Sequence, residues 1–334
     1  MKHLIDGKKQ QYKANLHCHT TLSDGKWTPE RVKEEYKKRG YSVVAITDHE
    51  RLVSHNDLTD DGILFLTAYE AYIRDLPHNG QLDPQSHINL YSKTPENKIV
   101  YFTPNHTKYT PKEEWDTLPY HYLVENRAYT VDFLRRMIAD AVDCGYLVCH
   151  NHPTWSYEDE SMAEAYADCF AMEIHNYSSL CEGHNEYNEH YYDYQLRSGR
   201  RPALIAADDN HNHRAVDDPR FDSFGGFTYI LADKLDYETV IEAMEKKDFY
   251  ASQGPEILSL TAEGGTLTIR TSPARSVFFI TNLRKRTAVH ATDGALTEAT
   301  CELSEHAEWV YAIVLDAEGK RAYTRAYTRA ELAD

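Results

Sequence analysis

The sequence of 334 residues predicts an α/β fold: a barrel of mainly parallel strands followed by a small antiparallel β module. Three observations predict it. Short apolar runs alternate with amphipathic stretches through most of the chain, a pattern typical of parallel strands joined by helices. Seven such runs without a GxGxxG turn favour a barrel over a dinucleotide-binding sheet. After about Gln253, short strand-like runs are joined by tight turns instead of helices.

Seven apolar runs are the expected barrel strands. They lie at residues 12–17, 41–47, 63–67, 87–91, 146–149, 170–174 and 203–207. Residues 75–125 are otherwise rich in Pro, Asn, Thr and Tyr, and we expect long loops there over one end of the barrel.

Four helices are expected, three between these strands and the fourth after the last of them. The sequence TPE at residues 28–30 starts the first, because Thr suits the N-cap and Pro the first helical position; Gly40 ends it. The second starts near Thr130, has apolar residues at helical spacing and stops at Gly145. The third and fourth cover residues 186–197 and 237–247.

The chain is expected to divide into a barrel at residues 1–253 and a β-rich accessory module at residues 254–334. Strands of the module are predicted at residues 258–262, 265–271, 277–282 and 309–316. A duplicated RAYT near the C-terminus is interpreted as a last strand that runs into a tail.

Composition and charge exclude several classes of protein. A formal net charge of −17 repels the phosphate backbone, so we expect no long nucleic acid as a partner. No apolar run approaches the ~20 residues that a membrane span needs, and no signal peptide is recognised at the N-terminus. The six cysteines form no CxxC motif, which favours the reducing cytoplasm. The oligomeric state is left open.

Histidines and acidic residues gather at the ends of the predicted strands. The C-terminal strand ends of a (β/α) barrel line its active site, so these residues should meet in one pocket. His17 and His19 project from one face of a strand, and paired imidazoles suit Zn, Mn or Fe. Nearby carboxylates can bridge two such ions. The residues concerned are His17, His19, Asp24, Asp48, His49, Glu70, His87, His150, His152, Glu173, His175, Asp208, Asp209 and His211.

Four motifs in this set resemble those of the PHP family, the polymerase and histidinol phosphatase domain. They are LHCHTTLSDG, ITDHE, NHP and DDNH, in that order between about residues 14 and 213. The resemblance implies a distorted (β/α)7 barrel, two or three divalent ions (Mn, Zn or Fe) and phosphoester hydrolysis. The later YASQGPEI and the β module are similar to the branch of the family that contains carbaryl hydrolase.

The same resemblance implies nine metal ligands. They are His17 and His19 for a first ion, His87 and His152 for a second, Asp24, His49 and His211 for a third, with Glu70 bridging and Asp209 closing the site. Asp208 and Glu173 are expected just behind the ligands, and Asp208 stands where the family usually has Ser.

The expected reaction is hydrolysis of a small-molecule phosphoester, with nucleotides or short oligonucleotides favoured. The cations would hold the phosphate oxygens and lower the pKa of a bound water towards ~7. His211 or His175 would protonate the leaving oxygen, and Asp48 is a further catalytic candidate. Candidate substrate contacts are Arg200, Arg201, Arg214 and His150.

Two alternatives stay open at this point. The same metals could hydrolyse a carbamate, an amide or a carboxyl ester. The protein could also bind metal without catalysis, although the complete ligand set disfavours this.

Overall fold

The computed structural model describes residues 1–74, 84–97, 99–100, 108–115, 119 and 127–333. The fold is mixed α/β, as predicted. Its strands form three hydrogen-bonded sheets of ten, five and four strands. None of these sheets closes on itself within the described ranges, so the predicted barrel is not confirmed.

The ten-stranded sheet runs from the C-terminal part of the chain into the N-terminal part. Its central path includes β14, β17, β18, β11, β10, β2, β3 and β4 in that order. Only the pairs β2–β3 and β3–β4 are parallel. The strands are β2 (Gln10–Asn15), β3 (Val43–Ala45), β4 (Leu64–Leu66), β10 (Phe227–Ala232), β11 (Phe249–Ser252), β14 (Ser276–Thr281), β15 (Thr287–His290), β17 (Trp309–Leu315), β18 (Arg321–Tyr323) and β19 (Tyr327–Thr328).

The five-stranded sheet contains β5 (Ala68–Arg74), β6 (Gln85–Ser92), β7 (Tyr146–His150), β8 (Ala171–Asn176) and β9 (Ala203–Ala207) in sequence order. Strands β7, β8 and β9 are parallel, but β6 is antiparallel to both of its neighbours. The first residues of β6 therefore lie at the same end of the sheet as the last residues of β7.

The four-stranded sheet contains β1 (Lys2–Ile5), β12 (Ile257–Glu263), β13 (Thr266–Ala274) and β16 (Leu296–Glu302). It shares a core with the C-terminal strands of the long sheet, including Leu260, Ile269, Phe279 and Val314. The first strand of the chain thus pairs with a strand beyond residue 254. The division at residues 253/254 stays a prediction.

Two sheets enclose the central core that leads to the polar site. Leu16 and Val43 pack there with Ile205 and Ile230. Strands β9 and β10 belong to different sheets, but the Thr228 hydroxyl accepts a hydrogen bond from the Ala206 N–H (3.2 Å) and donates to its carbonyl (3.0 Å). A side chain therefore joins the two sheets where a barrel would have a strand ladder.

The helices are α1 (Pro29–Lys38), α2 (Val131–Asp143), α3 (Tyr177–Cys181), α4 (Glu189–Arg197), α5 (Tyr237–Glu245) and α6 (Arg329–Leu332), with 3-10 turns at Asn56–Leu58, Lys112–Glu114 and Glu160–Tyr166. Thr28 caps α1 as predicted, and α2 starts where predicted, with Thr130 as its cap: each side chain accepts a backbone N–H bond from the first turn. Much of the loop region predicted at 75–125 lies outside the described residues.

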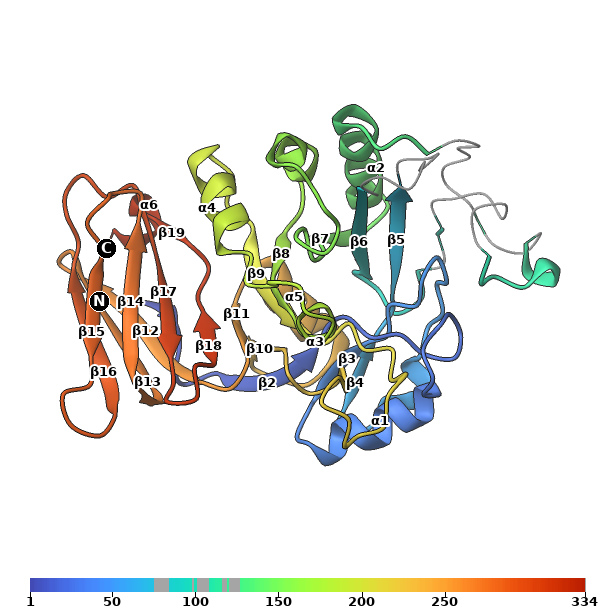
Figure 1. Cartoon of the computed structure of the whole chain (residues 1–334), viewed down its shortest axis with the longest axis horizontal. Coiled ribbons are helices and arrows are strands. Elements are labelled where there is room, and N and C mark those ends of the chain that lie inside the picture. The colour runs from blue at the N-terminus through green and yellow to red at the C-terminus, as the bar shows by residue number, and fades with distance from the viewer. Residues whose placement is uncertain (75–83, 98, 101–107, 116–118, 120–126, 334) are drawn as a thin grey trace.

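Figure 1 shows the C-terminal strands gathered at one end of the molecule, beside both chain termini, with α1 and α2 towards the other end. No helix of the described ranges combines the length and apolar character that a membrane-crossing helix requires.

Candidate metal centre

All nine predicted ligands meet at one end of the central core. Segments that follow β2, β3, β7 and β9 carry most of them, while Glu70 lies on β5 and His87 on β6. They form four overlapping groups, within each of which the ligand atoms lie within 4.8 Å of one another. The groups are His17, His19 and Glu70; His17, His152 and Asp209; His49, Glu70 and His87; and His19, Asp24, His49 and His211.

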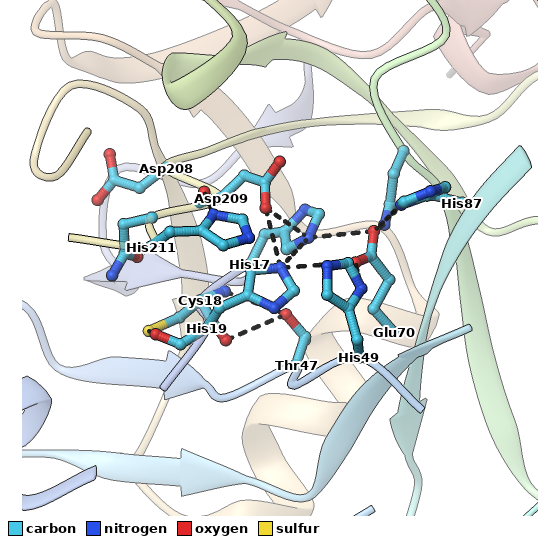
Figure 2. A network of polar contacts seen from close by, with 12 residues as sticks. His17, Cys18, His19, Thr47, His49, Glu70, His87, Asp208, Asp209 and His211 are labelled. Atoms are coloured by element: carbon cyan, nitrogen blue, oxygen red, sulfur yellow. Dashed lines mark hydrogen bonds and ion pairs between the residues drawn. The ribbon is translucent and has the colours of Figure 1, made fainter. Parts of the chain in front are cut away.

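The inner cluster, defined as the two groups that contain His17, is buried. Its members are His17, His19, Glu70, His152 and Asp209. The Nε2 atoms of His17 and His19 lie 3.2 Å apart, and each is 3.0 Å from Oδ1 of Asp209. Nε2 of His17 is also 3.3 Å from Oε1 of Glu70. Figure 2 shows these imidazoles and carboxylates converging on one region, which is the arrangement that a shared cation requires.

The outer group, defined as His19, Asp24, His49 and His211, is more open. Asp24 lies between two imidazoles, 3.5 Å from Nε2 of His211 and 3.7 Å from Nε2 of His49. The side chains of Asp24 and His211 are 36% and 22% exposed, whereas that of His19 is buried. An ion or a substrate that enters from solvent would therefore reach this group first.

Buried partners fix how the inner ligands are presented. Oε1 of Glu173 lies 2.7 Å from Nδ1 of His17, so Nδ1 carries the proton and Nε2 faces the cluster with its lone pair. The Asn151 amide donates to Oε1 of Glu70 (2.8 Å), and the Ser156 hydroxyl lies 3.2 Å from Nδ1 of His152. Glu173 thus lies directly behind His17.

The electrostatics of the cluster attract positive charge. Burial opposes ionisation of Glu70, but the imidazoles of His87 and His17 outweigh it and hold the pKa of Glu70 well below its usual range. Burial also lowers the pKa of His152, yet bonding to Glu70 and the charge of Asp209 raise that pKa to about 9. Burial, together with nearby imidazoles, lowers the pKa of His19 to about 4. The carboxylate of Glu70 is therefore ionised, and the imidazole of His19 is neutral and can donate a lone pair to an ion, whereas that of His152 is protonated near pH 7 until an ion displaces the proton.

One orphaned atom supports a metal in this position. Oε2 of Glu70 is buried and accepts no hydrogen bond, although the imidazole of His49 is 2.7 Å away. A buried acceptor without a donor is costly, and a divalent ion would satisfy it. Mixed imidazole and carboxylate ligands suit Zn, Mn or Fe. The residues present therefore fit a divalent-ion centre.

Two predicted site residues hold loops and do not face the cluster. Asp48 accepts from the Thr20 N–H (2.7 Å), the Thr20 hydroxyl (2.6 Å) and the Ser23 hydroxyl (2.6 Å). Asp208 points away from the cluster that Asp209 joins, as Figure 2 shows. These contacts do not support the catalytic role expected for Asp48.

His150 and His175 also lie away from the ligands. Strand β7 ends at His150, whose Nε2 lies 2.7 Å from Oε2 of Glu158, so it does not share a face with His152. A register shift between Glu173 and His175 turns the latter towards Gln253, whose amide is 3.0 Å from Nε2. Burial lowers the pKa of His175 to about 4, so it is neutral near pH 7.

A pocket of about 490 Å³ opens beside the cluster. Asp209 and His211 line it together with Trp155, Ser178, Arg214 and Arg220. Of the three predicted arginines, only Arg214 reaches this pocket. Arg200 and Arg201 precede β9, whereas Asp209 follows it, so they lie at the opposite end of the strand.

Several residues of the site carry no signal in the sequence. Gln85 lies 3.2 Å from Nε2 of His87, and the Tyr109 hydroxyl donates to Asp24 (3.1 Å). Asp222 also supports a candidate ligand, through a contact with its backbone N–H. Single amides, tyrosines and aspartates are common on surfaces, so only their three-dimensional partners distinguish them.

This clustered, cation-attracting set beside an open pocket is that of a metal-dependent hydrolase. More particularly, the chain belongs to the PHP domain family, whose model matches residues 15–250. The resemblance seen in the four motifs is thereby confirmed. No curated protein matches the sequence.

Three solved structures resemble the chain. A two-domain protein from Bacteroides vulgatus, containing a predicted PHP-like metal-dependent phosphoesterase, is 15% identical with a TM-score of 0.46 and covers 97% of this chain and 88% of its own. A candidate metal-dependent phosphoesterase from Bifidobacterium adolescentis is 15% identical with a TM-score of 0.43, covering 72% and 97%. An amidohydrolase from Chromobacterium violaceum, with bound sulfate and no metal, is 16% identical with a TM-score of 0.38, covering 59% and 87%.

Proposed function

We propose that this hydrolase is a phosphoesterase that acts on small phosphoesters, with nucleotides or short oligonucleotides as favoured substrates. The observation that carries the proposal is the sharing of His19 and Glu70 between neighbouring ligand groups. Shared ligands can hold two or three ions side by side. Several cations match a phosphoryl group, whose transition-state charge spreads over several oxygens, better than they match a single carbonyl oxyanion.

Zn, Mn or Fe is the proposed ion, since imidazole nitrogens and carboxylate oxygens are mixed in every group. When bound, such ions neutralise phosphate charge and lower the pKa of a coordinated water. Glu173 keeps His17 in the tautomer that can bind an ion, through its 2.7 Å contact with Nδ1. Glu70, shared by two groups, is the proposed bridge.

The pocket supplies the proposed contacts to substrate. Arg214 is exposed on its wall and forms no salt bridge within the described part of the chain, so its guanidinium can pair with a substrate anion. Trp155 lies edge-on to the imidazoles of His87 and His152, with ring centroids 5.2 and 4.9 Å apart, and presents an apolar surface beside them. Of the two predicted proton donors, only His211 lines the pocket.

One substrate panel tests the proposal. The protein would be loaded with Mn, Zn or Fe and assayed on nucleoside monophosphates, 3′,5′-bisphosphates, short oligonucleotides, sugar phosphates, aryl esters and aryl carbamates. Phosphoesters should give the highest kcat/KM. Highest kcat/KM for carbamates or esters, with phosphoesters near background, would overturn the proposal.

Substitution of Arg214 by Ala tests the pocket contact. Loss of a charge-assisted hydrogen bond costs about 1.5 kcal/mol, so KM for the best phosphoester should rise about tenfold. Arg200→Ala is the matched control, because Arg200 lies at the opposite end of β9. Equal effects of the two substitutions would contradict the placement of substrate in this pocket.

A further inference from the structure

The segment between β9 and β10 supplies candidate ligands to both parts of the metal centre. Asp209 belongs to the inner cluster and His211 to the outer group. Its backbone is strained. Asp209 and Asn212 have φ of 54° and 57°, and Phe224 has φ of 73°. Residues other than glycine rarely adopt such left-handed conformations unless surrounding contacts hold them there.

A buried carboxylate holds the strained backbone beside His211. Oδ2 of Asp222 accepts a hydrogen bond from the His211 N–H (2.7 Å), and Oδ1 accepts one from the Asn212 N–H (3.0 Å). Asp222 is 8% exposed, and the Asn212 amide is tied in turn to the Ser223 hydroxyl (2.6 Å). Asp222 therefore fixes the peptide units on both sides of the His211 side chain.

A second carboxylate holds the other end of the same segment. Asp208 accepts from the N–H groups of Phe224 (2.8 Å), Gly225 (2.9 Å) and Gly226 (2.9 Å), and from the Tyr36 hydroxyl (2.7 Å). The two aspartates thus reach across the segment in opposite directions, each binding backbone near the other. We call this pair the aspartate clamp.

We propose that Asp222 is a positioning residue that sets the affinity of the outer group for its ion, acting through the backbone of His211. The inference rests on the proposed metal-dependent function. His211 is the one member of the outer group that this segment supplies. The inner imidazole of His17 is fixed independently by Glu173, and Glu70 by Asn151. Loosening the clamp at Asp222 should therefore weaken one ion and leave the inner ions in place.

The main test is Asp222→Asn, measured by metal binding without substrate. The amide is isosteric but turns a donor towards one of the two backbone N–H groups. Removing a partner that orients a metal ligand typically lowers metal affinity by about 10- to 100-fold. Titration with a competing chelator should show that loss for one ion only. Asp222 also lines the pocket, but the isosteric amide leaves the shape of the pocket unchanged, so excess metal should restore most of kcat.

Two further variants complete the experiment. Asp218→Asn is the matched control on the same segment, since its carboxylate binds the Arg220 side chain and N–H and not the backbone of a ligand. It should bind metal as the wild type does. Ser223→Ala removes the acceptor of the Asn212 amide and should shift affinity in the same direction as Asp222→Asn, by less. It carries the test should Asp222→Asn fail to fold.

Unchanged affinity in the folded Asp222→Asn protein, or in Ser223→Ala if the former does not fold, would overturn the inference. Equal weakening of all ions would also overturn it, because that result indicates general loosening. Selective loss of one ion together with an inactive substrate panel would refute the phosphoesterase proposal and leave this inference standing. A wild-type protein that binds fewer than two ions would refute both.

Discussion

Glu173→Gln is the sharpest perturbation that the structure offers. The carboxylate is buried and receives three donors: Nδ1–H of His17 at Oε1 (2.7 Å), and the His152 N–H and the Asn176 amide at Oε2 (3.0 Å each). A glutamine has one acceptor oxygen and one donor nitrogen. Turning the oxygen towards the two donors loses fewer bonds, so the NH₂ group should face His17.

His17 would then have to accept at Nδ1 and carry its proton on Nε2. That proton would point at Asp209 and Glu70, where Nε2 now lies 3.0 and 3.3 Å from their oxygens, and the ring could no longer bind an ion there. Loss of such a partner lowers metal affinity about 10- to 100-fold, which corresponds to about 1.4–2.7 kcal/mol. Metal content after dialysis against graded chelator concentrations measures it.

Glu158→Gln provides a matched control. Glu158 is equally buried, lies 2.7 Å from Nε2 of His150 and also receives tyrosine hydroxyls, but this pair does not face the cluster. Both substitutions should lower the free energy of unfolding by about 1–3 kcal/mol. Only Glu173→Gln should lose metal. Wild-type metal affinity in Glu173→Gln, or equal metal loss in both variants, would refute the reasoning.

Three further predictions follow from the same geometry. The purified protein should hold two or three transition-metal ions, and elemental analysis showing less than one per chain would contradict the ligand groups. His17→Ala and Asp209→Ala should abolish turnover but keep the circular dichroism of the wild type; substantial activity in either metal-loaded variant would show the ligands to be misassigned. His175 has its pKa lowered to about 4 by burial, against 6.5 in the unfolded chain, so the unfolded chain binds its proton first as the pH falls. The resulting loss of stability approaches about 3 kcal/mol by pH 4, and His175→Gln should lose less stability than the wild type between pH 7 and pH 5 in chemical denaturation.

The parts of the fold that the sequence predicted well depend on local signals. Thr28 and Thr130 mark the starts of α1 and α2 because capping involves only the next few residues. The strand that the apolar run at residues 203–207 predicts has the same bounds as β9. The direction of β6 could not be predicted, because an apolar strand has the same pattern whether its neighbours are parallel or antiparallel. The link through Thr228, which replaces a strand ladder, depends equally on distant partners.

The candidate site also combines features that depend on local signals with features that depend on distant partners. The candidate ligands could be predicted, because imidazoles and carboxylates recur at short spacing, as in His17 and His19. The orientations of His150 and His175 could not be predicted, because His150 lies where a strand ends and His175 follows a register shift. The supporting role of Asp222 could not be predicted either. Its carboxylate accepts hydrogen bonds from two backbone N–H groups about ten residues away, and no local pattern in the sequence indicates such contacts.

The adjacent aspartates of the DDNH motif perform opposite tasks. Asp209 faces the imidazoles, which outweigh its burial and hold its pKa far below the usual range. Asp208 points the other way, and burial raises its pKa to about 6 despite the bonds that it accepts. Those bonds come from three backbone N–H groups and a tyrosine hydroxyl. Two carboxylate oxygens can accept four such donors, whereas a serine hydroxyl, with two lone pairs on one oxygen, cannot. The additional carboxylate at this position therefore serves the loop that carries the ligands, and not the ions themselves.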